Sequence, residues 1–157
     1  MGSNGGIIMG LDCYIMHNDC KTDFTSKDDP RIKDIDLFGG MMSGNGADGS
    51  FRGKFYEPLM DELMDEQYIW HIDESIHVQA CELKEQALAL ADLLHSVESD
   101  AKEQDLLIDD GKVTLLPETI IYKTDRMGAE YTYQEVQDLE LLLRCASEFN
   151  ARMVCWW

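Results

Sequence analysis

The sequence predicts an α+β fold in a single domain, with a small sheet that includes the first and last strands and packs against three to four helices. Three observations predict it. The 157 residues match the length of one ordinary domain. Apolar residues alternate near both ends of the chain, as in half-buried strands. Between the ends they recur at the three- and four-residue spacing of amphipathic helices.

Residues 1–8 are predicted to be a tag or a flexible leader, so the domain spans 9–157 and Met9 is the expected natural start. The first strand is expected over 7–17. Its alternation puts Cys13 and other apolar residues on one face, and Asp12 and Tyr14 on the other.

A polar segment over 18–33 follows, with a turn predicted at Asp29-Pro30. A short strand is expected over 34–38, and a glycine-rich loop over 39–53. The next helix is predicted over about 57–66, with Pro58 at its first position.

A longer helix is predicted from its apolar face, which runs from Ala80 to Val97, with Asp73 or Ser75 as its cap. A further weak helix is expected over 100–108. Short β-branched segments at 112–116 and 119–123 predict two strands on either side of Pro117.

The last helix has the clearest local signals. Thr132 and Glu135 form a predicted capping box at its start, and Asn150 is expected to end it in a left-handed conformation. Its predicted buried face extends to Phe149. Residues 151–157 are then expected to form the terminal strand.

The charge balance excludes some partners. The chain carries 31 acidic and 13 basic residues, a net charge of −18. Phosphate contacts need clustered lysine and arginine, so neither nucleic acid nor an anionic membrane is an expected partner. Most acids lie within 57–110, which predicts a strongly negative side that suits a basic protein partner or imitates a nucleic acid.

The five cysteines form no CxxC pair, and no stretch resembles a membrane span or a secretory signal. Reduced thiols and a cytoplasmic location are therefore expected.

The glycine-rich loop matches two ligand motifs only by letters. Residues 44–49 read GNGADG, but a dinucleotide site needs a buried strand directly before them and a helix that opens at the last glycine. An EF-hand counted from Asp34 has Phe38 at its fifth position, which requires an oxygen ligand, and Asn45 at its twelfth, which requires a bidentate glutamate. No cofactor is predicted.

The loop instead presents Ser50, Arg52 and Lys54. Two interpretations of Arg52 stay open. It either anchors the loop through a carboxylate such as Asp12, or grips a carboxylate or phosphate of a small anionic ligand.

The sequence contains no clear pattern of metal ligands or of a catalytic nucleophile with its base. The spacing of Cys13, His17 and Cys20 fits no usual zinc motif, and His71 and His77 do not share a helical face, so no metal site is predicted. A nucleophile such as Ser50 or Cys20 with His17, His71, His77 or His95 as base is conceivable, but no spacing selects a pair.

The last two residues are tryptophans, and neighbouring strand residues face opposite ways. A terminal strand beside the first strand would place one of them near Asp12 and Tyr14. The predicted ligand-binding residues are Asp12, Tyr14, Ser50, Arg52, Trp156 and Trp157, under the glycine-rich loop.

Three segments, MGLDCY from Met9, SFRGK from Ser50 and the closing pair of tryptophans, resemble a group of small bacterial and phage proteins that begin MGLDxY. The group is uncharacterised, so the resemblance implies no activity. It favours Met9 as the start and implies that Asp12, Tyr14, Ser50 and Arg52 meet in space.

Together these observations predict a binding or interaction module with its pocket beside the glycine-rich loop. Two alternatives stay open. One is an acidic inhibitor or nucleic-acid mimic that engages a basic partner through residues 57–110. The other is a small hydrolase that uses the same pocket.

Overall fold

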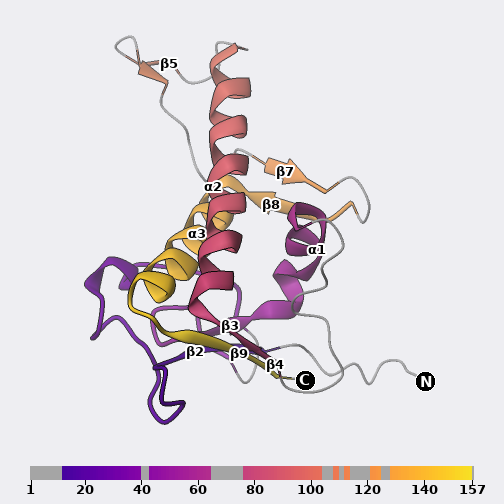
Figure 1. The fold of residues 1–157 in the computed structure, drawn as a ribbon. Helices are drawn as coiled ribbons and strands as arrows, with labels where there is room; N and C mark the ends of the chain where they lie inside the picture. Colours follow the sequence, from indigo (N-terminus) through magenta and orange to yellow (C-terminus); the bar gives the residue numbers. More distant parts are fainter. Residues whose placement is uncertain are drawn as a thin grey trace, which may run out of the picture.

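Four short strands form an antiparallel sheet in the order β3-β2-β9-β4 (Figure 1). The strands are β2 (Asp12–Met16), β3 (Ser50–Arg52), β4 (Ile76–Val78) and β9 (Arg152–Trp156). The structure, a computed structural model, describes residues 12–39, 43–64, 76–103, 108–109, 112–113, 121–124 and 128–156. The sheet joins strands from both ends of the described chain, so the predicted α+β class is confirmed.

The helices lie on one side of this sheet (Figure 1). They are α1 (Gly53–Leu63), α2 (Ala80–Glu103) and α3 (Tyr133–Glu148), with a 3-10 turn, η1, at Pro30–Ile32. α2 and α3 pack against each other, and α2 extends well beyond the sheet. Two hairpins complete the described structure. They join β5 (Ile108–Asp109) to β6 (Lys112–Val113) and β7 (Ile121–Lys123) to β8 (Glu130–Thr132).

Strand alternation decides which face of the sheet is covered. Cys13 and Ile15 of β2 are fully buried, and Cys13 lies opposite Phe51 on one side and Cys155 on the other. These side chains face the helices, where Leu83, Leu90, Leu139, Leu142 and Leu143 are also buried. Burial of one such leucine stabilises the fold by about 2 kcal/mol.

The last helix follows its local signals. The Thr132 hydroxyl accepts from the Glu135 amide at 3.1 Å, and the Glu135 carboxylate accepts from the Thr132 amide at 2.9 Å. Asn150 has φ 57°, so the predicted left-handed end is confirmed. Phe149 was predicted to be buried and is 46% exposed. α3 ends at Glu148, so Phe149 leaves the helical face and packs on Phe24 instead.

Three predictions around the glycine-rich segment are wrong. Residues 34–38 form no strand and only one bridge, between Asp36 and Gly46, because their backbone groups bond to several different segments. The loop predicted over 39–53 ends early, since its last residues form β3 and Gly53 opens α1. Pro58 therefore lies inside α1, which extends back to include the fully buried Tyr56.

The start of α2 also differs from the prediction. Residues 76–78 form β4, so the predicted caps Asp73 and Ser75, which lie outside the described residues, precede a strand. The Gln79 carbonyl accepts from the Leu83 amide, and the Glu82 carboxylate accepts from the Gln79 amide. At its other end α2 runs without a break to Glu103, and β5 occupies 108–109, so the helix predicted over 100–108 is wrong at both of its ends, while 104–107 lie outside the described residues.

The predicted leader over 1–8 and Trp157 lie outside the described residues. In the part of the chain that is described, the helices are too short or too polar to cross a bilayer.

Candidate functional site

The register of the sheet brings most of the predicted ligand-binding residues together. Asp12 lies opposite Arg52 of β3 and Trp156 of β9, and Tyr14 lies opposite Ser50. Directly opposed residues of antiparallel strands share one face of the sheet. The strand positions of these five residues therefore fall on the face that points away from the helices.

Asp12 and Arg52 form an ion pair on this face, with 3.5 Å between Oδ1 of the carboxylate and Nη1 of the guanidinium. Asp12 is 8% exposed, and its buried Oδ1 accepts no hydrogen bond from the described residues. Partial burial raises the pKa of the neighbouring Tyr14, and the charge of Asp12 adds to this. This ion pair is the contact expected if Arg52 anchors the loop through Asp12. Binding of a ligand by Arg52 stays a prediction.

Ser50 holds the glycine-rich loop closed. Its hydroxyl accepts from the Gly44 amide at 2.8 Å and donates to Oδ1 of Asp48 at 3.2 Å, while its carbonyl accepts from the Gly46 amide at 2.7 Å. Gly49 has φ 90° and lies so close to the Phe24 carbonyl that an added Cβ would come within 2.5 Å of the oxygen. Here the glycines allow the loop to pack on its own chain.

A cavity of about 690 Å³ lies elsewhere, between α2, α3 and the segment around η1. Five carboxylates line it, from Asp34, Asp36, Glu98, Asp138 and Glu140. Its basic residues are Arg31, His95 and Arg144.

The two arginines of this cavity are already paired. Arg31 contacts Asp29 at 2.8 Å and Glu148 at 2.7 Å, and Arg144 contacts Glu140 at 2.8 Å. Across residues 12–39, 43–64, 76–103 and 128–156, no cation lies within ion-pair distance of the other four carboxylates. These are Asp34, Asp36, Glu98 and Asp138. The cavity therefore carries uncompensated negative charge.

Asp138 is the most enclosed of these four acids. It is 7% exposed and accepts hydrogen bonds from the Asp36 amide at 3.1 Å and the Gln134 side chain at 2.8 Å. Burial raises its pKa, which the two hydrogen bonds oppose. Glu98 accepts from the Tyr133 hydroxyl, and this contact with Glu98 raises the pKa of Tyr133 further, beyond the larger effect of burial.

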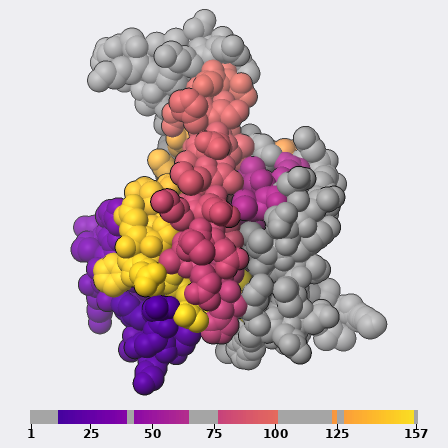
Figure 2. All heavy atoms as spheres, viewed as in Figure 1, coloured from indigo at the N-terminus to yellow at the C-terminus, as the bar shows by residue number. Residues whose placement is uncertain are grey.

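An apolar groove of about 530 Å³ adjoins the acidic cavity, because both are lined by Ala91, Glu140 and Arg144. The groove adds Ala87 and Leu88 of α2, and Leu88 is 57% exposed. In Figure 2 the crimson spheres of α2 run beside the yellow spheres of the chain that contains α3. The cavity and the groove, which share these three lining residues, are together called here the α2–α3 groove.

Sequence reasoning missed this groove. It placed the negative side within 57–110, whereas three of the four uncompensated acids of the groove, Asp34, Asp36 and Asp138, lie outside that range. The sequence of α3 did contain an indication of the groove. At helical spacing, a mostly polar face lies next to the apolar face of this helix, and it is formed by Gln134, Gln137, Asp138 and Leu141.

The histidines considered as bases separate in the structure. Nε2 of His17 lies 3.2 Å from a carboxylate oxygen of Asp28, His95 lines the acidic cavity, and His71 lies outside the described residues. Only Cys20 and His77 meet as a thiol and an imidazole among the described contacts, with 3.9 Å between Sγ and Nδ1. The described residues hold no cluster of three or more histidine, cysteine, aspartate or glutamate side chains that would bind a metal ion.

Three comparisons, with protein-family models, with curated proteins and with solved structures, found no match to this chain.

Proposed function

We propose that this protein is an interaction module that binds a basic, amphipathic segment of a partner protein in the α2–α3 groove. The observation that carries the proposal is the pairing of four uncompensated carboxylates with an adjoining apolar groove. A segment with lysine or arginine beside an apolar residue would complement both parts.

The charges would act mainly on recognition. Opposite charges across an interface speed association and select partners, and the net charge of −18 would add long-range attraction for a basic chain. Exposed charge pairs each contribute only about 0.2–1 kcal/mol. An apolar anchor therefore has to supply much of the affinity, and Leu88 with Ala87 and Ala91 offers the surface for it.

The test is a binding titration with a labelled 18-residue amphipathic peptide of lysine and leucine, followed by fluorescence anisotropy at low and moderate NaCl. The variant Asp34→Asn/Asp36→Asn/Glu98→Gln removes three exposed charges from the groove. Its matched control, Glu85→Gln/Asp92→Asn/Asp100→Asn, removes three exposed acids of α2 that line neither part of the groove.

We expect the groove variant to weaken binding about tenfold, because it removes roughly 1–2 kcal/mol of local attraction, and to reduce the salt dependence. The control should weaken binding less than threefold. Leu88→Ser should weaken binding without changing the salt dependence. Equal losses in the two triple variants would show unspecific attraction to an acidic protein and refute the assignment of the groove.

A second candidate is a small-ligand site on the outer face of the sheet, favoured by the buried Oδ1 of Asp12 that accepts no hydrogen bond within the described chain. Such an oxygen suits a ligand group that donates a hydrogen bond. Nuclear magnetic resonance screening of small hydroxyl and amine compounds would test it. Shifts at Asp12, Tyr14 and Arg52 that disappear in Asp12→Ala would support the site, and no shift with any compound would count against it.

A further inference from the structure

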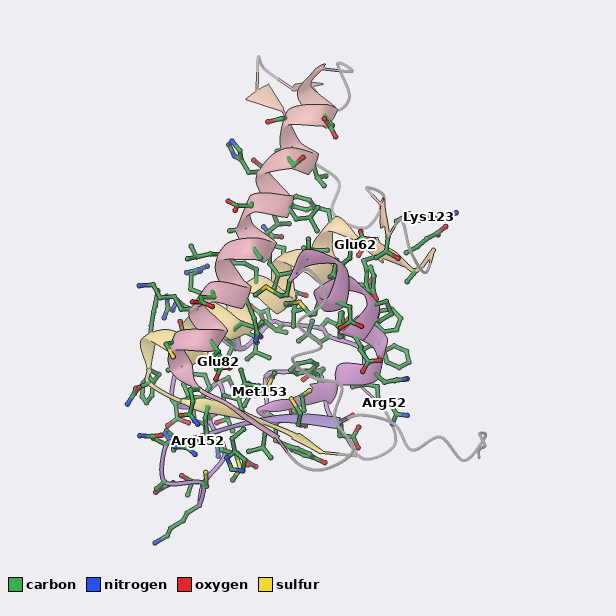
Figure 3. All side chains as sticks on the ribbon, turned by 45° about the vertical axis from the view of Figure 1, so that its right-hand side comes forward. Arg52, Glu62, Glu82, Lys123, Arg152 and Met153 are labelled. Carbon is green, nitrogen blue, oxygen red and sulfur yellow. The ribbon has the colours of Figure 1, made fainter. Side chains whose placement is uncertain are left out.

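A polar cluster lies at the end of the sheet where β2 ends and β9 begins. It consists of Asn18, Cys20, His77 and Arg152, which come from the segment after β2, from β4 and from β9. Arg152 and Arg52 occupy opposite ends of the sheet (Figure 3). The cluster is therefore separate from the Asp12–Arg52 pair, and it does not line the α2–α3 groove.

The backbone holds the thiol of Cys20 in place. The segment folds back on itself, since the His17 amide donates to the Thr22 carbonyl at 2.9 Å and the Cys20 amide donates to the His17 carbonyl at 2.8 Å. Cys20 has φ 59°, a conformation that residues with a Cβ rarely adopt. Asn18 ties the turn to β9, because its Oδ1 accepts from Nη2 of Arg152 at 2.6 Å.

The contact with Arg152 indicates which tautomer a neutral His77 ring adopts. Nη1 of Arg152 lies 3.3 Å from Nδ1 of His77, and a guanidinium can only donate hydrogen bonds. Nδ1 therefore carries a lone pair, and the ring proton of the neutral imidazole sits on Nε2. The same Nδ1 lies 3.9 Å from the sulfur of Cys20, so a basic nitrogen faces the thiol.

Arg152 also provides an uncompensated positive charge. Arg31, Arg52 and Arg144 each contact a carboxylate. Arg152 instead contacts only neutral groups, Asn18 and His77, and none of the carboxylates in the described parts of the chain lies within ion-pair distance of it. Although the chain has a net charge of −18, the guanidinium of Arg152 can attract anions locally.

The other four cysteines lack this environment. Cys13, Cys145 and Cys155 are buried, and burial raises the pKa of Cys13 and, to about 12, that of Cys145. The raised pKa keeps the thiols of Cys13 and Cys145 protonated, and burial covers all three thiols. Cys81 is exposed but precedes the acidic Glu82 in the first turn of α2.

We propose that Cys20 is the reactive thiol of this protein and forms a mixed disulfide with small anionic disulfides. The hydrogen bond from Arg152 to Nδ1 of His77 breaks and frees the single lone pair of this nitrogen, the thiol proton moves to Nδ1, and the thiolate sulfur attacks one sulfur of the disulfide. The disulfide bond breaks as the new S–S bond forms, and the other half leaves as a thiolate that takes up the proton. Cys20 is oxidised and the leaving half is reduced. Arg152 orients the imidazole and attracts the carboxylates of the reagent.

Two reagents separate these roles: glutathione disulfide, which is anionic, and bis(2-hydroxyethyl) disulfide, which is neutral. Mixed disulfides are counted and located by mass spectrometry at pH 7. The variants Cys81→Ser and Cys20→Ser each leave a single cysteine that is not buried, so their rates report Cys20 and Cys81 separately. We expect glutathione disulfide to modify Cys20 at least about tenfold faster than Cys81, because the thiolate is the nucleophile and Arg152 attracts the reagent.

Further variants in the Cys81→Ser background assign the neighbours. His77→Gln keeps an acceptor for Arg152 but takes up no proton, so it should slow both reagents alike. Arg152→Gln should slow glutathione disulfide more than the neutral reagent, and Arg152→Lys should recover part of that difference. For the Arg152 variants, loss of local structure alone would slow both reagents equally and would leave no difference between them.

Several results would overturn the proposal. If Cys81 were modified as fast as Cys20, the proposal that Cys20 is the reactive thiol would be refuted. An unchanged rate in His77→Gln would exclude the imidazole as the proton acceptor. An equal effect of Arg152→Gln on both reagents would refute the preference for anionic disulfides.

Discussion

Gly49 shows how one residue controls the glycine-rich loop. With φ 90°, and with the Phe24 carbonyl 2.5 Å from the position of an added Cβ, Gly49→Ala meets both a backbone penalty and a clash. We expect it to lower the free energy of unfolding by more than about 2 kcal/mol in urea denaturation. Gly128→Ala is the matched control, since Gly128 has φ 66° but only ordinary contacts. Its loss should be about 1 kcal/mol. Equal losses would mean that the loop moves aside.

Asp29 predicts a pH dependence at the same scale. It caps η1, and its hydrogen bonds with the Arg31 side chain lower its pKa below the ordinary value of 3.8. A lowered pKa in the folded state means that this stabilisation is complete above pH 3.8 and is lost as the pH falls through the folded pKa. Asp29→Asn keeps the cap but loses the ion pair.

At pH 7 we expect Asp29→Asn to be less stable than the unmodified chain by about 1 kcal/mol, and the difference should shrink below pH 3.8. Denaturant titrations at pH 7 and in the acid range measure it. Asp19→Asn is a suitable control, because Asp19 is exposed and bonds the Lys21 amide without an ion pair among the described residues. It should change stability by less than about 0.5 kcal/mol. A difference for Asp29→Asn that grows in acid would contradict the assignment.

At the scale of elements, α3 depends on its capping box. Thr132→Ala removes the acceptor for the Glu135 amide, which should lower the free energy of unfolding by about 1 kcal/mol. Thr132→Ser keeps the hydroxyl and should stay within about 0.5 kcal/mol of the unmodified chain. Chemical denaturation of the unmodified chain, Thr132→Ala and Thr132→Ser measures these differences in the free energy of unfolding. Because Tyr133 and Gln134 line the acidic cavity directly after this cap, Thr132→Ala should also weaken peptide binding in the α2–α3 groove.

For the whole molecule, the net charge of −18 predicts stabilisation by salt. Like charges repel one another more strongly in the compact state, and the Debye length falls from about 30 Å at 0.01 M to about 10 Å at 0.1 M ionic strength. The Tm should therefore rise on addition of NaCl, which calorimetry can measure. The variant Asp34→Asn/Asp36→Asn/Glu98→Gln should show a smaller rise. A Tm that decreases with NaCl would indicate that ion pairs such as Arg31–Asp29 outweigh the repulsion.

Much of the fold was predictable where the signal is local. The alternation of β2, the capping box of α3 and the left-handed Asn150 each depend on residues a few positions apart. The three-residue strand β4 was not predicted, because its pairing with β9 stabilises it and its own β-propensity does not. Of the candidate site, the meeting of Asp12 with Arg52 was foreseen. The cavity was not, because Asp34 and Glu98 come from segments far apart in the chain.

The sequence by itself determined the α+β class, the capped start of α3 and the excess of negative charge, since periodicity, caps and composition act within one segment or over the whole chain. Only the tertiary structure decided which charges stay uncompensated. It pairs Arg52 with Asp12 and Arg144 with Glu140, and it leaves Arg152 beside His77 and Cys20. The physical reason is that an ion pair or a thiol–imidazole contact depends on distances of 3–4 Å, which are set by the packing of strands and helices distant in sequence.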